Sequence, residues 1–153
     1  MWFTGTGSVI KYEQIVGLIK EHSKNNGSVF IGTDSFLTKD TCVFSTAICL
    51  HGANGQKGGN YFIKRSKLRN NSSSLVARMT EEVHRSVEVG MKLIEEGIDV
   101  KIEIHIDVSG PNANAETSKY SDMLTGYAKG AGFDAKVKPN SWASSAVADK
   151  HSK

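Results

Sequence analysis

The sequence has few cysteines, and they are not arranged as metal ligands. Its 153 residues include two, Cys42 and Cys49, and contain no CxxC pair. The lack of such a pair argues against a zinc site built from thiolates. Since the two cysteines lie an odd number of positions apart in one apolar run, they point to opposite faces of a strand there and cannot pair with each other. Unpaired, buried thiols are typical of a reducing compartment, so we expect a cytoplasmic protein.

Long apolar runs and repeats are also lacking. No stretch approaches the ~20 apolar residues that a membrane-spanning helix needs, and the amino terminus lacks the charged-then-apolar pattern of a signal peptide. We find no internal repeat and no heptad array. The glycine-rich segment 52–59 does not match the P-loop pattern. The sequence therefore predicts neither a membrane protein nor a nucleotide phosphotransferase of the P-loop kind.

Basic residues slightly outnumber acidic residues. The chain has 19 basic and 16 acidic residues, a net charge of 19 − 16 = +3, and a sequence pI near 8.8. This balance is compatible with a polyanionic partner but is shared by many proteins that bind no nucleic acid. A hydrophobic content of 39% and a charged content of 23% are ordinary for a folded domain. We expect one domain over residues 1–153, in which 1–27 form a lead-in and a first helix.

Hydrophobic periodicity predicts alternating helices and strands after an irregular lead-in at 1–8. Helices are expected at 11–25, 72–96, 115–130 and from 141, and strands at 28–34, 41–50, 60–65, 99–107 and 133–138. The serines at 72–74 offer N-caps for the long helix. Three strands with short connections predict an antiparallel meander, and the later strand–helix units predict parallel strands. The predicted fold is α/β, with a mixed five-stranded sheet flanked by helices.

Two acidic residues stand at the ends of apolar strands. Asp34 follows the run 29–33, and Asp107 follows the run 100–106. A carboxylate at the end of a buried strand costs desolvation energy unless something compensates it. If these two strands are parallel neighbours in the sheet, Asp34 and Asp107 come side by side.

Two further acidic residues are expected on helices. In the long helix, Leu75, Met79, Val83, Ser86 and Gly90 form one stripe. Glu82 lies at the edge of this stripe, so it is directed toward the sheet, and Ser86 and Gly90 are small enough for close packing. Asp149 lies on the last helix.

The four carboxylates of Asp34, Glu82, Asp107 and Asp149 are predicted to form a metal site. Hard oxygen ligands suit Mg²⁺ or Mn²⁺. Two such ions ~4 Å apart can activate water and stabilise the leaving oxygen of a phosphodiester.

Each acidic residue also has an interpretation that requires no metal, and these alternatives stay open at this point. Asp34 and Asp107 could form or cap turns, Glu82 could pair with Arg78, and Asp149 could be solvated on a frayed helix end.

Other residues are candidates for contacts with a substrate. Lys138 and His105 are expected near the carboxylates, where a cation could stabilise developing charge and an imidazole could relay a proton. Alternatively, His105 could be a core histidine whose ring nitrogens have hydrogen-bond partners. Trp142 could stack on a base or anchor the last helix. Ser35 directly follows Asp34. Four basic residues between the third strand and the long helix could hold backbone phosphates or be a solvated loop: Lys64, Arg65, Lys67 and Arg69.

The sequence resembles the YkuK-like family of bacterial and phage proteins in the ribonuclease H-like superfamily. The resemblance covers about residues 28–151, and the block 138–150 is its most specific part. The matching residues are Ile31, Gly32, Thr33, Asp34 and Ser35; Arg78, Glu82 and Ser86; His105, Ile106, Asp107 and Val108; Ser118, Gly126, Gly130, Gly132 and Phe133; and the whole block from Lys138 to Lys150.

This resemblance implies a ribonuclease H-like fold and phosphodiester hydrolysis with two metal ions. The superfamily's acidic residues fall on Asp34, Glu82, Asp107 and Asp149. We therefore expect a metal-dependent nuclease that uses Mg²⁺ or Mn²⁺ on RNA or an RNA–DNA hybrid. The alternative is a non-catalytic nucleic-acid or protein-interaction module on the same fold.

Overall fold

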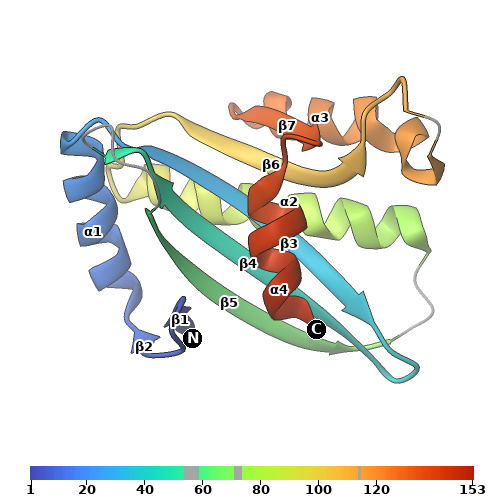
Figure 1. Ribbon diagram of the computed structural model, residues 1–153, viewed down its shortest axis with the longest axis horizontal. Helices are drawn as coiled ribbons and strands as arrows, with labels where there is room; N and C mark the ends of the chain where they lie inside the picture. The colour runs from blue at the N-terminus through green and yellow to red at the C-terminus, as the bar shows by residue number, and fades with distance from the viewer. Residues whose placement is uncertain (54–58, 71–73, 114) are drawn as a thin grey trace.

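The strands of the protein form one mixed sheet. The computed structural model describes residues 1–53, 59–70, 74–113 and 115–153 (Figure 1). The strands are β1 (Trp2–Thr4), β2 (Val9–Ile10), β3 (Ser28–Leu37), β4 (Thr41–His51), β5 (Gly59–Arg69), β6 (Ile102–Ser109) and β7 (Asp134–Lys138). Their order in the sheet is β2-β1-β5-β4-β3-β6-β7. Neighbours from β2 to β3 are antiparallel, whereas β6 and β7 continue the sheet in parallel, so the predicted α/β class and mixed sheet are confirmed.

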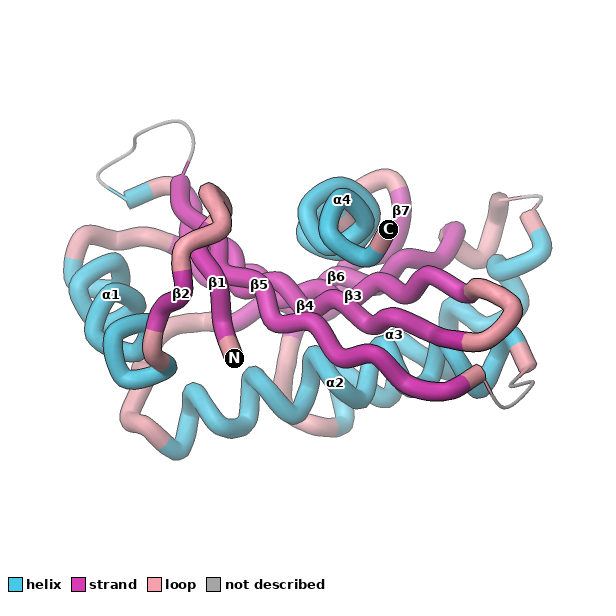
Figure 2. The backbone as a smooth tube through the Cα atoms, turned by 90° about the horizontal axis from the view of Figure 1, so that it is seen from below, coloured by secondary structure: helices cyan, strands magenta, loops and turns pink. Residues whose placement is uncertain are grey.

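Helices cover both faces of this sheet. They are α1 (Tyr12–Lys24), α2 (Leu75–Glu95), the 3₁₀ turn η2 (Glu116–Tyr120) and α3 (Ser121–Gly130), followed by a π-helical segment η3 (Ala143–Ala148) that continues into α4 (Asp149–Ser152). We call η3 and α4 together the C-terminal helix. Figure 2 shows α2 and α3 on one side of the sheet and the C-terminal helix on the other.

Two predictions about strands were wrong. The expected irregular lead-in contains β1, in which Trp2 pairs with Lys64, so two short strands extend the predicted five. The third strand of the meander continues to Arg69 instead of ending near 65, because its backbone stays paired with β4 as far as Thr41. The four basic residues at 64–69 therefore lie on a strand and not in a loop.

Helix α2 packs as its apolar stripe predicts. Met79 and Val83 are buried in the larger core, and Ser86 bonds Thr33 of β3 at 2.7 Å between hydroxyl oxygens. At Gly90, an added Cβ would lie 2.8 Å from the ring of Phe133. Ser74 accepts a hydrogen bond from the amide of Ala77 and caps the helix. The predicted capping serines at 72 and 73, and residues 54–58 of the glycine-rich segment, lie outside the described residues.

The C-terminal helix lies directly against strand β3. A Cβ at Gly32 would lie 2.6 Å from the carbonyl carbon of Ala143 and would also meet the backbone of Ser144. Only a glycine at this position lets the helix backbone approach so closely. Five buried residues form the small core beneath the helix: Ala47, Cys49, Ile63, Ala143 and Ala148.

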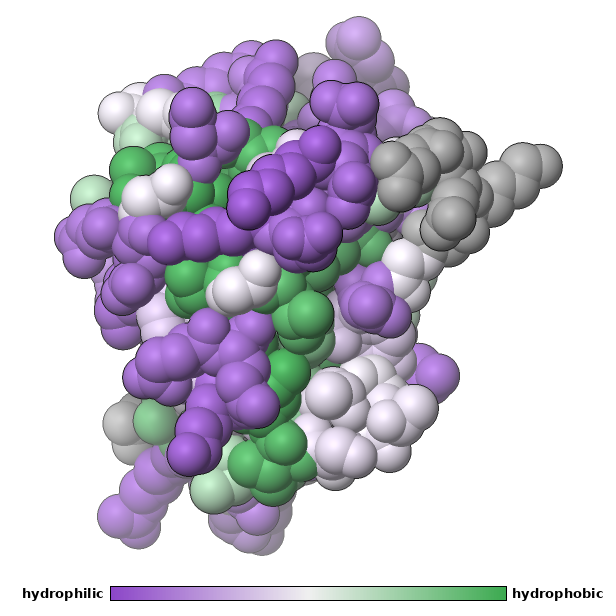
Figure 3. All heavy atoms as spheres, turned by 90° about the vertical axis from the view of Figure 1, so that its left-hand side faces the viewer, coloured by the Kyte–Doolittle hydropathy of each residue, from purple (hydrophilic) through white to green (hydrophobic). Residues whose placement is uncertain are grey.

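The molecular surface is mainly hydrophilic at the end that carries α1. Figure 3 shows this end, where apolar side chains appear between larger hydrophilic areas. Among the exposed apolar residues of the first 20 positions are Val9 and Leu18. Within the described ranges, no helix combines the length and apolar character needed to cross a membrane.

Candidate active site

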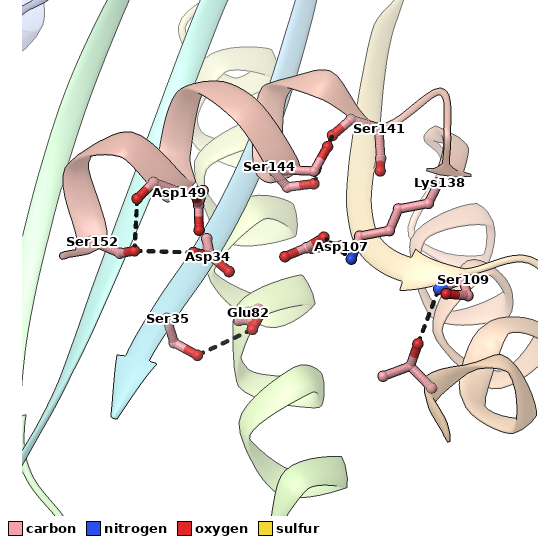
Figure 4. A network of polar contacts seen from close by, with 12 residues as sticks. Asp34, Ser35, Glu82, Asp107, Ser109, Lys138, Ser141, Ser144, Asp149 and Ser152 are labelled. Atoms are coloured by element: carbon pink, nitrogen blue, oxygen red, sulfur yellow. Dashed lines mark hydrogen bonds and ion pairs between the residues drawn. The ribbon is translucent and has the colours of Figure 1, made fainter. Parts of the chain in front are cut away.

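The parallel strands β3 and β6 bring two aspartates together. Their ladder ends where Gly32 pairs with His105. Asp34 and Asp107 each lie two positions further along, so both side chains point to the face that the C-terminal helix covers. Figure 4 shows their carboxylates pointing toward each other. Both residues lie inside strands, which rules out the alternative that they serve as turn residues.

Glu82 approaches the aspartates from the opposite face of the sheet, the face that α2 covers. Its carboxylate accepts a hydrogen bond from Ser35 at 3.1 Å. The charges of Asp34 and Asp107 both act on it, because β3 and β6 are no longer paired at this level. In the described part of the chain no ion pair joins Glu82 to Arg78, so the predicted alternative of a simple i, i+4 pair is not found.

The C-terminal helix contributes the fourth carboxylate and a hydroxyl. Asp149 is about one-third exposed, and its Oδ1 lies 3.1 Å from Nζ of Lys153. One turn later, the buried Ser152 donates a hydrogen bond to Oδ2 of Asp34 at 2.9 Å (Figure 4). The helix therefore both adds an acidic group to the cluster and orients Asp34.

Burial and crowding change the acidity of the cluster. Burial, reinforced by the neighbouring carboxylates of Asp107 and Asp149, raises the pKa of Asp34 to about 7. The hydrogen bond from Ser152 opposes this shift. Burial, followed by the charge of Asp34, also raises the pKa of Glu82. The ionised forms of Asp34 and Glu82 are therefore disfavoured by their surroundings.

Lys138 lies beside Asp107. Its Nζ lies 3.0 Å from Oδ1 of Asp107. This is an ion-pair distance. The contact lacks hydrogen-bond geometry, since this buried oxygen has no hydrogen-bond partner among the described residues. The sequence-based placement of Lys138 beside the carboxylates agrees with this contact.

His105 is held by structural contacts and is separate from the cluster. It is 2% exposed. Its Nδ1 accepts the amide hydrogen of Ala143 at 3.0 Å, so Nε2 carries the proton and donates to Glu103 at 2.8 Å. Burial lowers the pKa of His105. With both ring nitrogens engaged, His105 is not positioned for the proton relay that we considered from the sequence.

Trp142 packs against aromatic residues of the sheet. Its ring centroid lies 5.3 Å from that of His105 and 5.0 Å from that of Phe30. Of its two sequence-based interpretations, these contacts support the anchor of the last helix.

The basic residues of β5 are divided between the two faces of the sheet. Arg65 pairs with Ser45, which pairs with Asp34, so these three side chains form one row on the face of the C-terminal helix. Lys67 and Arg69 follow on the same face by alternation. Lys64 points to the opposite face, where its Nζ lies 5.9 Å from the ring centroid of Trp2. The four predicted substrate contacts therefore do not form one cluster.

The carboxylates are suitable ligands for a hard divalent cation, but they are not close enough together to form a metal centre. Their ligand atoms are oxygens, as such a cation prefers, and burial together with the neighbouring carboxylates makes the ionised form of Asp34 unfavourable without a cation. Over the described ranges, however, no three or more His, Cys, Asp or Glu side chains are grouped closely enough to hold a metal ion. Binding would require the carboxylates of Asp34, Glu82, Asp107 and Asp149 to move closer together.

Two hydroxyl groups at this site were not predicted from the sequence. Ser152 lies three residues after Asp149, and this helical spacing is the signal that could have placed it on the same side of the helix. Ser45 lies directly opposite Asp34, and its buried hydroxyl has no hydrogen-bond partner in the described part of the chain. Its position depends on strand register, for which the sequence offers no comparable signal.

Comparison with known proteins shows the family of the chain. The ribonuclease H-like family matches residues 11–153. A protein of Bacillus subtilis (strain 168), named "Uncharacterized protein YkuK", is 24% identical over 156 residues, which cover 92% of this chain and 88% of the relative. No solved structure matches the chain. With nearly its whole length matched, the chain belongs to the ribonuclease H-like family, and it is similar to the YkuK protein.

Proposed function

We propose that the protein is a metal-dependent nuclease that hydrolyses phosphodiester bonds of RNA or of an RNA-containing duplex. Membership of the ribonuclease H-like family supports a role in nucleic-acid chemistry. The observation that carries the finer proposal is the meeting of Asp34, Glu82 and Asp107 where β3 and β6 separate, with Asp149 supplied from the C-terminal helix.

These four carboxylates would hold the Mg²⁺ or Mn²⁺ ions. When bound, such ions neutralise phosphate charge and make water a better nucleophile near neutral pH. Asp34 has to lose its proton before it can serve as a ligand, and its pKa of about 7 places that step near neutrality.

Neighbouring side chains prepare the carboxylates for this role. Ser152 and Ser35 donate hydrogen bonds to Asp34 and Glu82 and thereby fix their orientation. Lys138, beside Asp107, supplies a positive charge that would stabilise an oxygen gaining negative charge during cleavage.

The exposed basic residues of β5 give the substrate a place to bind. Arg65, Lys67 and Arg69 extend from the row that contains Asp34. Positive charges along a strand attract backbone phosphates whatever the base sequence. They would align a nucleic-acid strand with the carboxylates.

One observation favours a second candidate, a nucleic-acid-binding module without catalysis. The acidic side chains of the described residues are not grouped as a metal centre. A module of this kind would retain affinity for nucleic acid and would be insensitive to chelators.

A cleavage assay separates the two candidates. The protein is incubated with Mn²⁺ or Mg²⁺ and a panel of RNA, single-stranded DNA, duplex DNA and RNA–DNA hybrid. We expect cleavage of RNA or hybrid that EDTA abolishes, and Asp107→Asn should slow it by about 100-fold or more. Asp122→Asn, an exposed acidic position on α3, is the matched control and should cleave like the wild type. Substrate binding without any cleavage, unchanged by EDTA, would favour the module instead.

A further inference from the structure

A groove outside the carboxylate cluster opens between α2 and the far ends of the long strands. Its volume is about 400 Å³, within the range of pockets that hold small organic ligands. It lies between the first turns of α2 and the ends of β3, β4 and β5. Its lining includes Leu37, Cys42, Phe44, Leu68, Arg78 and Glu81.

One wall of the groove is apolar although it faces solvent. Leu37 and Leu68 are 39% and 46% exposed. Cys42 lies between them in the sheet, and Phe44 follows two positions further along the same face of β4. The guanidinium of Arg85 covers one side of Phe44, with its Cζ 4.5 Å from the ring centroid. Two exposed leucines with an aromatic ring next to them give a surface on which a flat apolar group can lie.

The other wall carries an incompletely bonded arginine. The Nε of Arg78 is buried and has no hydrogen-bond partner among the described residues. The nearby carboxylate of Glu81 is already bonded to Arg85 at 2.9 Å. A buried donor without an acceptor is unfavourable, and a guanidinium is well suited to bind a phosphate. The groove therefore combines an apolar surface with a site for an anion.

We propose that this groove binds one unpaired nucleotide, with its base against Leu37 and Leu68 and its phosphate on Arg78. The inference rests on the proposed function, because it describes how that enzyme would take up its substrate. Arg78 precedes Glu82 by one helical turn, and its charge reaches the carboxylate of Glu82. Because Glu82 is the carboxylate of the cluster that comes from the α2 face, the nucleotide in the groove would belong to a single strand or overhang that reaches the cluster at Glu82.

Binding is measured by fluorescence anisotropy with a short labelled oligouridylate, in EDTA and in the Asp107→Asn background so that no cleavage occurs. We expect Arg78→Gln and Leu68→Asp each to weaken binding by about tenfold. Met91→Asp is the matched control: Met91 is 50% exposed on α2 but does not line the groove, so its affinity should change by less than about twofold. Free uridine 5′-monophosphate should compete with the oligonucleotide, and a blunt duplex should show no effect of Leu68→Asp.

Affinity that is the same in Arg78→Gln, Leu68→Asp and Met91→Asp would overturn the inference, provided that circular dichroism shows all three folded. A protein that cleaves but has normal substrate affinity in the groove variants would be a nuclease without this subsite. Weaker binding in the groove variants of a protein that never cleaves would support the groove and contradict the nuclease.

Discussion

Asp34 couples the protonation of the site to the stability of the fold. In an unfolded chain an aspartate titrates at about 3.9, whereas burial and neighbouring carboxylates raise the pKa of Asp34 to about 7. A raised pKa in the folded state means that the folded protein binds the proton more tightly. The associated stability is fully present below about pH 4 and is lost as the pH rises through about 7.

The variant Asp34→Asn tests this linkage. Without divalent cations, the free energy of unfolding of the wild type should fall relative to that of the variant between about pH 4 and pH 8, by an amount on the order of a few kcal/mol. Thermal or urea unfolding across this range measures the difference. Parallel pH profiles of the two proteins would contradict the raised pKa.

Divalent cations should reverse this trend. At pH 8 the carboxylates are charged, so Mg²⁺ or Mn²⁺ should raise the melting temperature of the wild type, and less so at pH 5, where protons compete for Asp34. If the melting temperature rose equally in the double variant with Asp34→Asn and Glu82→Gln, this result would contradict a metal site formed by the four carboxylates.

Ser152 should tune the same carboxylate. Its hydroxyl lowers the pKa of Asp34, so Ser152→Ala should raise that pKa further and shift the loss of stability to higher pH. Ser145→Ala is the control, because its hydroxyl donates to the backbone carbonyl of Ser141, which lies just before the C-terminal helix. The pH dependence of the melting temperature distinguishes a specific effect on Asp34 from a general loss of stability.

At the scale of elements, the docking of the C-terminal helix on β3 completes the site. Gly32→Ala would push a methyl group into the helix backbone and should cost about 2 kcal/mol of stability. Gly17→Ala is the matched control on α1, where an added Cβ meets nothing within 4 Å, and should stabilise the protein by about 1 kcal/mol. Hydrogen exchange of residues 143–152 measures the expected loosening. Unchanged protection in Gly32→Ala would show that the helix adapts without leaving the sheet.

The elements that the sequence could predict are those whose pattern is local. The stripe on α2 and the alternation around Ile104 were sufficient to place both segments in the core. Strand β1 and the end of β5 were missed because they exist through pairing with distant backbone, while their own residues have weak or charged strand patterns.

The sequence predicted the residues of the site better than it predicted their arrangement in space. Hydrophobic runs pointed to Asp34 and Asp107, but no local pattern shows that β3 and β6 separate after Gly32, which lets Glu82 join from the other face. His105 has the right spacing for the site, yet contacts made by Glu103 and Ala143 hold it elsewhere.

At the scale of the whole molecule, the net charge is small, but several basic residues are concentrated on one face of the sheet. Arg65, Lys67 and Arg69 share the face of Asp34. Arg65→Gln combined with Lys67→Gln should weaken nucleic-acid binding for every base sequence. It should also reduce the slope of log affinity against log salt by about 1 for each phosphate that the protein no longer neutralises. Lys20→Gln combined with Lys24→Gln on α1 removes the same charge elsewhere and should leave the slope unchanged. Equal slopes in both double variants would indicate diffuse attraction only.

The bond from Ser152 to Asp34 spans 118 positions of the sequence. During synthesis on a ribosome, the β3–β4–β5 hairpins emerge long before residue 152 does. Until the C-terminal helix has left the exit tunnel, Asp34 therefore lies in a partly formed sheet, without its hydroxyl partner and without Asp149. Any property of Asp34 that depends on both partners is therefore acquired only after translation of that helix.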